Sequence, residues 1–85
     1  MNYEDFTVGD IVGFYNNEDT HQTMLYIEKV LKIDKDYIKT IIIRCLMDRN
    51  DAHFFINRTQ IYLKNDLELY NNLRLLTNLE KLKYL

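Results

Sequence analysis

The stretch from Leu73 to Glu80 constrains the fold most, because it marks a change from strand to helix. Leu73 to Leu76 is a short apolar run, and Thr77 and Glu80 follow it at the T-x-x-E spacing of a capping box. In such a box the threonine hydroxyl accepts from the backbone N–H three residues on, and the glutamate carboxylate accepts from the threonine N–H. The pattern therefore predicts a strand over 73–76 and a short C-terminal helix over 78–85.

The length of the chain limits it to one small domain. Its 85 residues are near the size at which a single hydrophobic core suffices. The composition, 47% hydrophobic and 28% charged, is that of an ordinary globular domain and excludes low-complexity disorder. We therefore treat residues 1–85 as one domain.

The sequence gives no sign of secretion or of a membrane span. Cys45 is the single cysteine, so no intrachain disulfide can form. The N-terminal segment is acidic and lacks the positive charge and apolar stretch of a signal peptide. The longest aliphatic run, Ile41–Ile43, is far shorter than the roughly 20 residues of a membrane-spanning helix. These features predict a cytoplasmic protein without membrane contact.

Most of the chain has the composition of short strands. The segment 8–15 predicts a turn into a first strand, and 23–33 predicts a second strand with a bulge near Glu28. After a turn over 34–36, the segment 37–47 is apolar on both sides, which predicts a central strand covered on both faces. We expect a polar loop over 16–20 and a fourth strand beginning at 53–56. The stretch 59–70 fits strands or a helix, and we favour strands or an irregular crossing.

A small β-barrel accounts for this order of elements. Closing a meander of five or six short antiparallel strands removes its exposed edges. The predicted fold is therefore mainly β, an SH3-like barrel with a short C-terminal helix. Leu79 and Leu82 lie on one side of that helix, and we expect them to be buried and to plug one end of the sheet.

Catalytic and metal-binding patterns are weak. His21, Cys45, Asp48, Asp51 and His53 are the residues from which a metal site could be built, but they lack the spacing of known zinc sites. There is no serine, and Cys45 lies among aliphatic residues, where an unreactive buried thiol is expected. We therefore expect no enzyme activity, no cofactor and no metal. A metal-dependent enzyme using His21, Asp51 and His53 is kept as a third hypothesis.

Charge is unevenly distributed along the chain. Residues 1–28 contain acidic residues and no Lys or Arg, whereas basic residues predominate in 29–64, and the formal net charge is −2. The second and third predicted strands carry the residues that could contact nucleic acid or a partner: Lys29, Lys32, Lys39 and Arg44, with Tyr26 and Tyr37 as stacking platforms. The negative net charge argues against phosphate-backbone binding, so nucleic-acid binding is the alternative hypothesis.

Both ends of the chain resemble one group of proteins. Val8-Gly9-Asp10-Ile11-Val12 and Leu73-Arg74-Leu75-Leu76-Thr77-Asn78-Leu79-Glu80 together resemble the opening V-G-D-x-V strand and the closing L-R-L-A-T-x-x-E junction of small uncharacterised bacterial, phage and mobile-element proteins. The resemblance implies an SH3-like barrel with a C-terminal helix. Leu76 replaces the usual small residue, which implies locally different packing. The group has no agreed activity, so no functional residue carries over.

The main functional hypothesis is a small non-enzymatic binding module. It would act by stoichiometric contact with a protein partner that the sequence does not identify, in a phage or mobile-element setting. The sequence leaves a homodimer open as well.

Overall fold

The computed structural model describes residues 3–16, 23–48 and 50–85 of the chain. Its elements follow in the order η1 (Tyr3–Asp5), β1 (Ile11–Asn16), β2 (Thr23–Ile33), β3 (Tyr37–Cys45), η2 (Ala52–Phe55), β4 (Thr59–Leu63), α1 (Lys64–Tyr70), β5 (Leu73–Leu75) and α2 (Asn78–Tyr84), where η marks a 3-10 helix. The loop expected over 16–20 lies outside the described residues except for Asn16, and so does His21.

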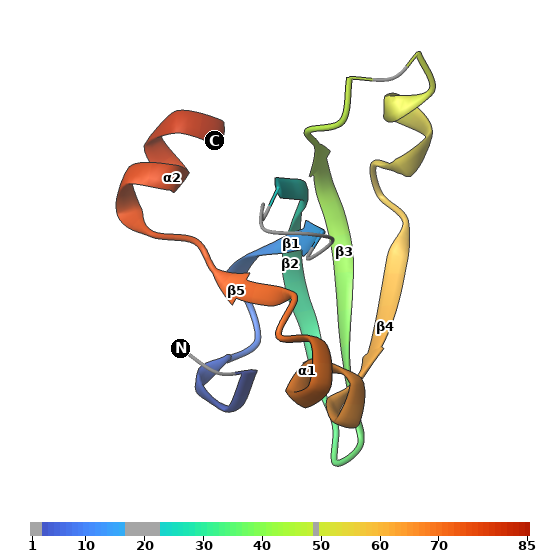
Figure 1. Cartoon of the computed structure of the whole chain (residues 1–85), viewed down its shortest axis with the longest axis vertical. Helices are drawn as coiled ribbons and strands as arrows, with labels where there is room; N and C mark the ends of the chain where they lie inside the picture. The colour runs from blue at the N-terminus through green and yellow to red at the C-terminus, as the bar shows by residue number, and fades with distance from the viewer. Residues whose placement is uncertain (1–2, 17–22, 49) are drawn as a thin grey trace.

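The five strands form one antiparallel sheet, which confirms the mainly β prediction. The strand order is β4-β3-β2-β1-β5, so β1 pairs with both β2 and β5. Figure 1 shows β1 and β5 running across the direction of β3 and β4, so the sheet bends strongly along its length. Within the described residues the sheet does not close, and β4 and β5 are its two end strands.

The two long strands agree closely with the sequence pattern. β2 has the predicted bounds, and the register between β2 and β3 shifts between Ile27 and Glu28, where the bulge was expected. β3 has a neighbour on each side, as predicted for a central strand. The prediction that both faces of β3 are covered is wrong. Ile38 and Ile42 on one face are fully buried, whereas Ile41 and Ile43 are only half-buried.

The main core cluster lies on one side of the sheet, which we call the inner face, whereas Ile27, opposite Gly13, is fully buried on the other side. Side chains of residues directly opposite on paired strands share a face, and alternate residues along a strand share it too. Phe6 and the α1 residue Leu67 cover this face and pack on residues from all five strands. The inner-face members of this cluster are Val12, Phe14, Val30, Ile33, Ile38, Tyr62, Leu73 and Leu75.

Two predictions between β3 and β5 are wrong. The apolar segment 53–56 lies mostly in η2, because Phe54 N–H donates to Asp51 O within a tight turn and Asn57 then adopts a left-handed backbone with φ 70°. The favoured interpretation of 59–70 holds only for β4. Residues 64–70 form α1, which buries Leu67 and ends at Asn71 in the left-handed region, a usual helix C-terminus.

The C-terminal junction is confirmed, but the packing of its helix is not. Glu80 N–H donates to Thr77 Oγ1 at 3.2 Å, and Thr77 N–H donates to Glu80 Oε1 at 2.9 Å, which is the predicted capping box. Leu79 and Leu82 are 78% and 82% exposed, so they do not plug the sheet. Instead α2 is attached by polar contacts: Tyr15 Oη donates to Glu80 Oε2, and Arg44 donates to the Tyr84 carbonyl.

No helix among the described residues combines the length and the apolar character that crossing a membrane requires.

Candidate functional surface on the sheet

The surface opposite the inner face on β2, β3 and β4 brings together several of the predicted contact residues. Lys32 is opposite Lys39, Lys29 is opposite Ile41, and Lys39 is in turn opposite Ile61. Because residues opposite one another share a face, these side chains form one surface. We call it the outer face and define it by Lys29, Lys32, Tyr37, Lys39, Ile41, Ile61 and Leu63.

The outer face is both basic and apolar. Ile61 and Leu63 on β4 are 56% and 52% exposed, and Lys29 is exposed on β2, on the other side of β3. Exposed aliphatic side chains on a strand leave apolar area in contact with water, which burial against another surface would remove. The outer face therefore combines positive charge for orientation with apolar area for affinity.

Among the outer-face lysines, only Lys32 forms an ion pair or a cation–π contact within the described part of the chain. Lys32 Nζ lies 3.4 Å from Asp34 Oδ2 and 5.7 Å from the centre of the Tyr37 ring. These partners, Tyr37 first and Asp34 second, raise the pKa of Lys32 and keep it charged. Lys29 and Lys39 form no ion pair with any described residue. Their ammonium groups are therefore available to an acidic ligand.

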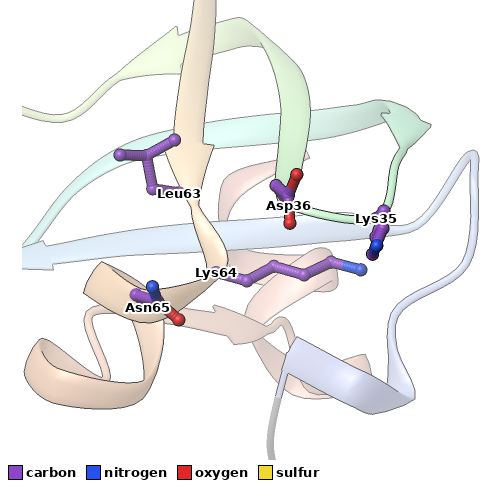
Figure 2. A pocket seen from close by; sticks show the side chains of 5 residues that line it. All are labelled: Lys35, Asp36, Leu63, Lys64 and Asn65. Atoms are coloured by element: carbon purple, nitrogen blue, oxygen red, sulfur yellow. The ribbon is translucent and has the colours of Figure 1, made fainter.

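A pocket adjoins the outer face at Leu63. It has a volume of about 280 Å³ and lies between the turn joining β2 to β3 and the start of α1. Its lining residues are Lys35, Asp36, Leu63, Lys64 and Asn65. Figure 2 shows the Lys64 side chain running toward the side of the pocket where Lys35 lies, and Lys64 N–H donates to Asp36 O at 2.9 Å. The two lysines extend the positive charge of the outer face to the end of the sheet.

The structure separates the remaining two predicted contact residues from this surface. Tyr26 packs against the rings of Phe14 and Phe55, with ring centres 5.9 and 5.8 Å apart. Arg44 lies at the far end of β3 and donates to the Tyr84 carbonyl at the end of α2. Lys29, Lys32, Lys39 and Tyr37 are thus brought together, whereas Tyr26 and Arg44 are not part of the group.

The metal hypothesis gains no geometric support. Among the described residues, no group of three or more His, Cys, Asp or Glu side chains could hold a metal ion. His53 packs against Phe54, and Cys45 is half-buried opposite Tyr26 rather than buried as expected. His21 lies outside the described residues.

A buried carboxyl group on the inner face was not anticipated from the sequence. Glu28 is fully buried, its Oε1 accepts from Thr40 Oγ1 at 2.5 Å, and the Tyr62 hydroxyl lies 2.8 Å from both of its oxygens. Burial raises the pKa of Glu28, and the hydrogen bonds from Thr40 and Tyr62 oppose that rise. Burial also raises the pKa of Tyr62. Because the core encloses this group and the described hydroxyls satisfy it, its role is in the fold.

Sequence reasoning also missed two aliphatic members of the outer face. The signal was the alternation in Thr59-Gln60-Ile61-Tyr62-Leu63, which places Ile61 and Leu63 on one side of a strand and Tyr62 on the other. The neighbouring helix residues made that alternation ambiguous.

No protein-family model, no curated protein and no solved structure matches the chain.

Proposed function

We propose that the chain is a small non-enzymatic binding module that contacts a partner protein through its outer face. The observation that carries the proposal is the register of β2, β3 and β4. It places Lys29, Lys32 and Lys39 on one surface with the exposed Ile61 and Leu63. The matching partner surface is apolar in part and carries acidic side chains.

The balance of charged and apolar groups supports a protein partner. Protein interfaces combine an apolar centre with polar groups around it. On the outer face Ile61 and Leu63 on β4 supply the apolar area, Lys39 lies on the adjoining strand β3, and Lys29 and Lys32 lie on β2 beyond it. Complementary charge speeds association and orients the partner, whereas the apolar contact supplies most of the affinity.

Nucleic-acid binding is the second candidate, and the three neighbouring lysines favour it. Binding of single strands also uses exposed aromatic rings on which bases stack. Tyr37 is half-buried and has Lys32 against its ring, and Tyr26 packs on core aromatics. The net charge of −2 and the exposed aliphatic residues favour protein over phosphate.

We further propose that the fold is an SH3-like barrel and that the protein acts in the cytoplasm. The strand order β4-β3-β2-β1-β5 and the strong bend between β1 and β3 support the barrel assignment (Figure 1). The resemblance of the two chain ends supports an association with phages or mobile elements.

Charge reversal on the outer face tests the function. The chain is used to capture proteins from a bacterial lysate, side by side with a Lys29→Glu/Lys39→Glu variant and a Lys81→Glu/Lys83→Glu control. The control makes the same charge change on α2. We expect a stoichiometric protein that the control recovers and the outer-face variant loses.

Two outcomes count against the proposal. If the outer-face variant recovers the same protein equally well, the outer face is not the contact surface. If instead the chain elutes from DNA and RNA columns only at raised salt, and the outer-face variant does not bind, the nucleic-acid alternative replaces the proposal.

A further inference from the structure

The free edge of β4 borders the outer face. β4 is an end strand of the sheet, and Figure 1 shows it at the side of the molecule away from α2. Among the described residues, only β3 pairs with it. An end strand presents backbone donors and acceptors along its outer side, and another chain can pair with them.

The hydrogen-bond pattern identifies which groups face outward. Lys64 N–H donates to Asp36 O, and Ile42 N–H donates to Arg58 O. In an antiparallel pair, bonded positions alternate with non-bonded ones. Even-numbered residues of this segment therefore bond to β3, and the N–H and C=O groups of Thr59 and Ile61 point away from the sheet, as does the N–H of Leu63. The C=O of Leu63, the N-cap residue of α1, accepts the first hydrogen bond of that helix.

Natural edge strands are usually protected by charge or proline, and β4 has neither. Its five residues, Thr59 to Leu63, are uncharged, and the chain contains no proline. Basic residues flank the strand directly, Arg58 before it and Lys64 after it, and no acidic residue occurs from position 52 to 65. The edge is thus apolar in the centre and positive at both ends.

The positive charge at both ends of β4 favours an acidic segment over a second copy of this chain as the added strand. A second copy pairing along all five β4 residues would run antiparallel and be centred on Ile61. That register places Arg58 of one copy opposite Lys64 of the other at each end, where like charges repel. An extended segment with acidic residues at both ends meets opposite charges instead.

We propose that the partner contributes an extended segment, aliphatic in its centre and acidic at both ends, which pairs with β4 as a sixth strand. The inference rests on the proposed function and specifies its partner. Backbone hydrogen bonds to the N–H and C=O of Ile61 and to the N–H of Leu63 hold the segment, and its side chains on the outer face lie against those of Ile61 and Leu63. Arg58 and Lys64 lie about 20 Å apart along the strand, so about seven residues span the site.

A pair of synthetic peptides tests the proposal. Both are capped seven-residue peptides of alternating valine and threonine, one with glutamate at each end and one with lysine. Each is titrated into the isotopically labelled chain while amide signals and hydrogen exchange are followed by NMR. We expect the glutamate peptide to bind about tenfold more tightly at low salt and to slow exchange at Ile61 and Leu63.

Proline at the edge separates backbone pairing from side-chain contact. Ile61→Pro removes an N–H that β3 does not use, so the sheet should remain intact. Ile61→Val keeps the N–H and is the matched control. We expect the proline variant to lose peptide binding and the valine variant to keep it.

Several results would overturn the inference. They are equal binding of the two peptides, no change at the β4 amides at millimolar peptide, or an unaffected Ile61→Pro variant. A dimer of the free chain that Ile61→Pro dissociates would assign the edge to a second copy. If Ile61→Pro still captures the partner while Lys29→Glu/Lys39→Glu does not, the edge inference fails and the proposed function stands.

Discussion

The two faces of β2, β3 and β4 use the same kinds of residue for different purposes. Each face carries aliphatic and charged side chains, and they alternate along the same strands. On the inner face the charged group, Glu28, is fully buried and hydrogen-bonded by two hydroxyls. On the outer face Lys29 and Lys39 lack a described ion-pair partner, and Ile61 and Leu63 remain exposed.

This difference shows that a core and a binding surface differ in whether their charged groups have hydrogen-bond or ion-pair partners within the chain, rather than in their composition. A buried charge without hydrogen bonds would cost several kcal/mol, so Glu28 is retained only with Thr40 and Tyr62 beside it. Lys29 is exposed and Lys39 is half-exposed, so water can solvate their ammonium groups in the free chain. The inner face should therefore govern stability, and the outer face should govern binding.

The largest effect is expected for truncation of an inner-face aliphatic residue. Ile38 is fully buried in the core cluster, and Ile38→Ala should lower the free energy of unfolding by about 2–5 kcal/mol. The matched outer-face variant, Ile61→Ala, should change it by less than about 0.5 kcal/mol. Urea unfolding measures both. If Ile38→Ala prevents folding, Ile38→Val should still show a loss of about 1 kcal/mol. Equal losses for Ile38→Ala and Ile61→Ala would remove the distinction between the faces.

The second-largest loss of stability is expected on removing the Tyr62 hydroxyl, which donates a hydrogen bond to Glu28. Tyr62→Phe keeps the ring, which stacks on Phe14 with centres 5.7 Å apart, and removes only the hydroxyl. The variant should be less stable by about 1–3 kcal/mol, because it leaves a buried carboxyl group with one partner fewer. Thermal unfolding at neutral pH measures this loss. An unchanged melting temperature would mean that Glu28 does not depend on Tyr62.

The pH dependence of stability should carry opposite signs at two glutamates. Burial raises the pKa of Glu28 in the folded chain, so its contribution is most favourable below its ordinary value of 4.5 and falls as pH rises through the folded pKa. The Thr77 N–H lowers the pKa of Glu80, so that contribution is present above 4.5 and is lost as pH falls through the folded pKa.

Glutamine substitutions separate these two contributions. Glu28→Gln should remove the loss of stability on raising pH, and Glu80→Gln should remove a loss on lowering it. Unfolding curves recorded across the acidic and neutral range provide the comparison. A Glu28→Gln variant that keeps the slope of the original chain would show that burial does not raise the pKa of Glu28 in the folded chain.

A smaller effect is expected where a local motif, rather than burial, stabilises the structure. Thr77→Ala removes the N-cap acceptor of α2 and should cost about 1 kcal/mol. Thr77→Ser keeps a hydroxyl and should restore most of that loss. Thermal unfolding distinguishes the two variants, and an unchanged midpoint for alanine would show that the cap contributes nothing to stability.

The smallest effect on stability is expected on the outer face. Lys39→Glu should change the free energy of unfolding by no more than about 0.5 kcal/mol, since Lys39 has no described ion pair to lose. Urea unfolding at low and at moderate salt is the measurement. A loss of several kcal/mol would place Lys39 in the folded framework rather than on a free surface.

Sequence patterns that span only a few residues predicted the capping box and the β2 bulge correctly. The capping box at Thr77 and Glu80 depends on side chains three residues apart, and β2 shows a bulge where Glu28 interrupts the alternation. Residues 53–56 and 64–70 were mispredicted because a short apolar run fits several structures. Only tertiary contacts decide between them, such as the packing of Leu67 in the core.

The sequence also predicted part of the candidate site, namely the residues that lie on neighbouring predicted strands. Lys29, Lys32, Tyr37 and Lys39 lie on neighbouring strands, so their grouping followed from the strand assignments. Ile61 and Leu63 join them only through the register of β4, and the buried Glu28 accepts a hydrogen bond from Tyr62, which is 34 residues away in the sequence. The exposure of Leu79 and Leu82 depends on the polar attachment of α2 through Tyr15 and Arg44, which sequence spacing does not reveal.

Lysine footprinting of the complex with the captured partner shows directly whether the partner binds the outer face. Each lysine is acetylated in the free chain and in the complex, and mass spectrometry compares their reactivity. We expect Lys29, Lys32 and Lys39 to become protected while Lys81 and Lys83 on α2 stay reactive. Protection of Lys81 and Lys83 with unchanged reactivity of the outer-face lysines would contradict it.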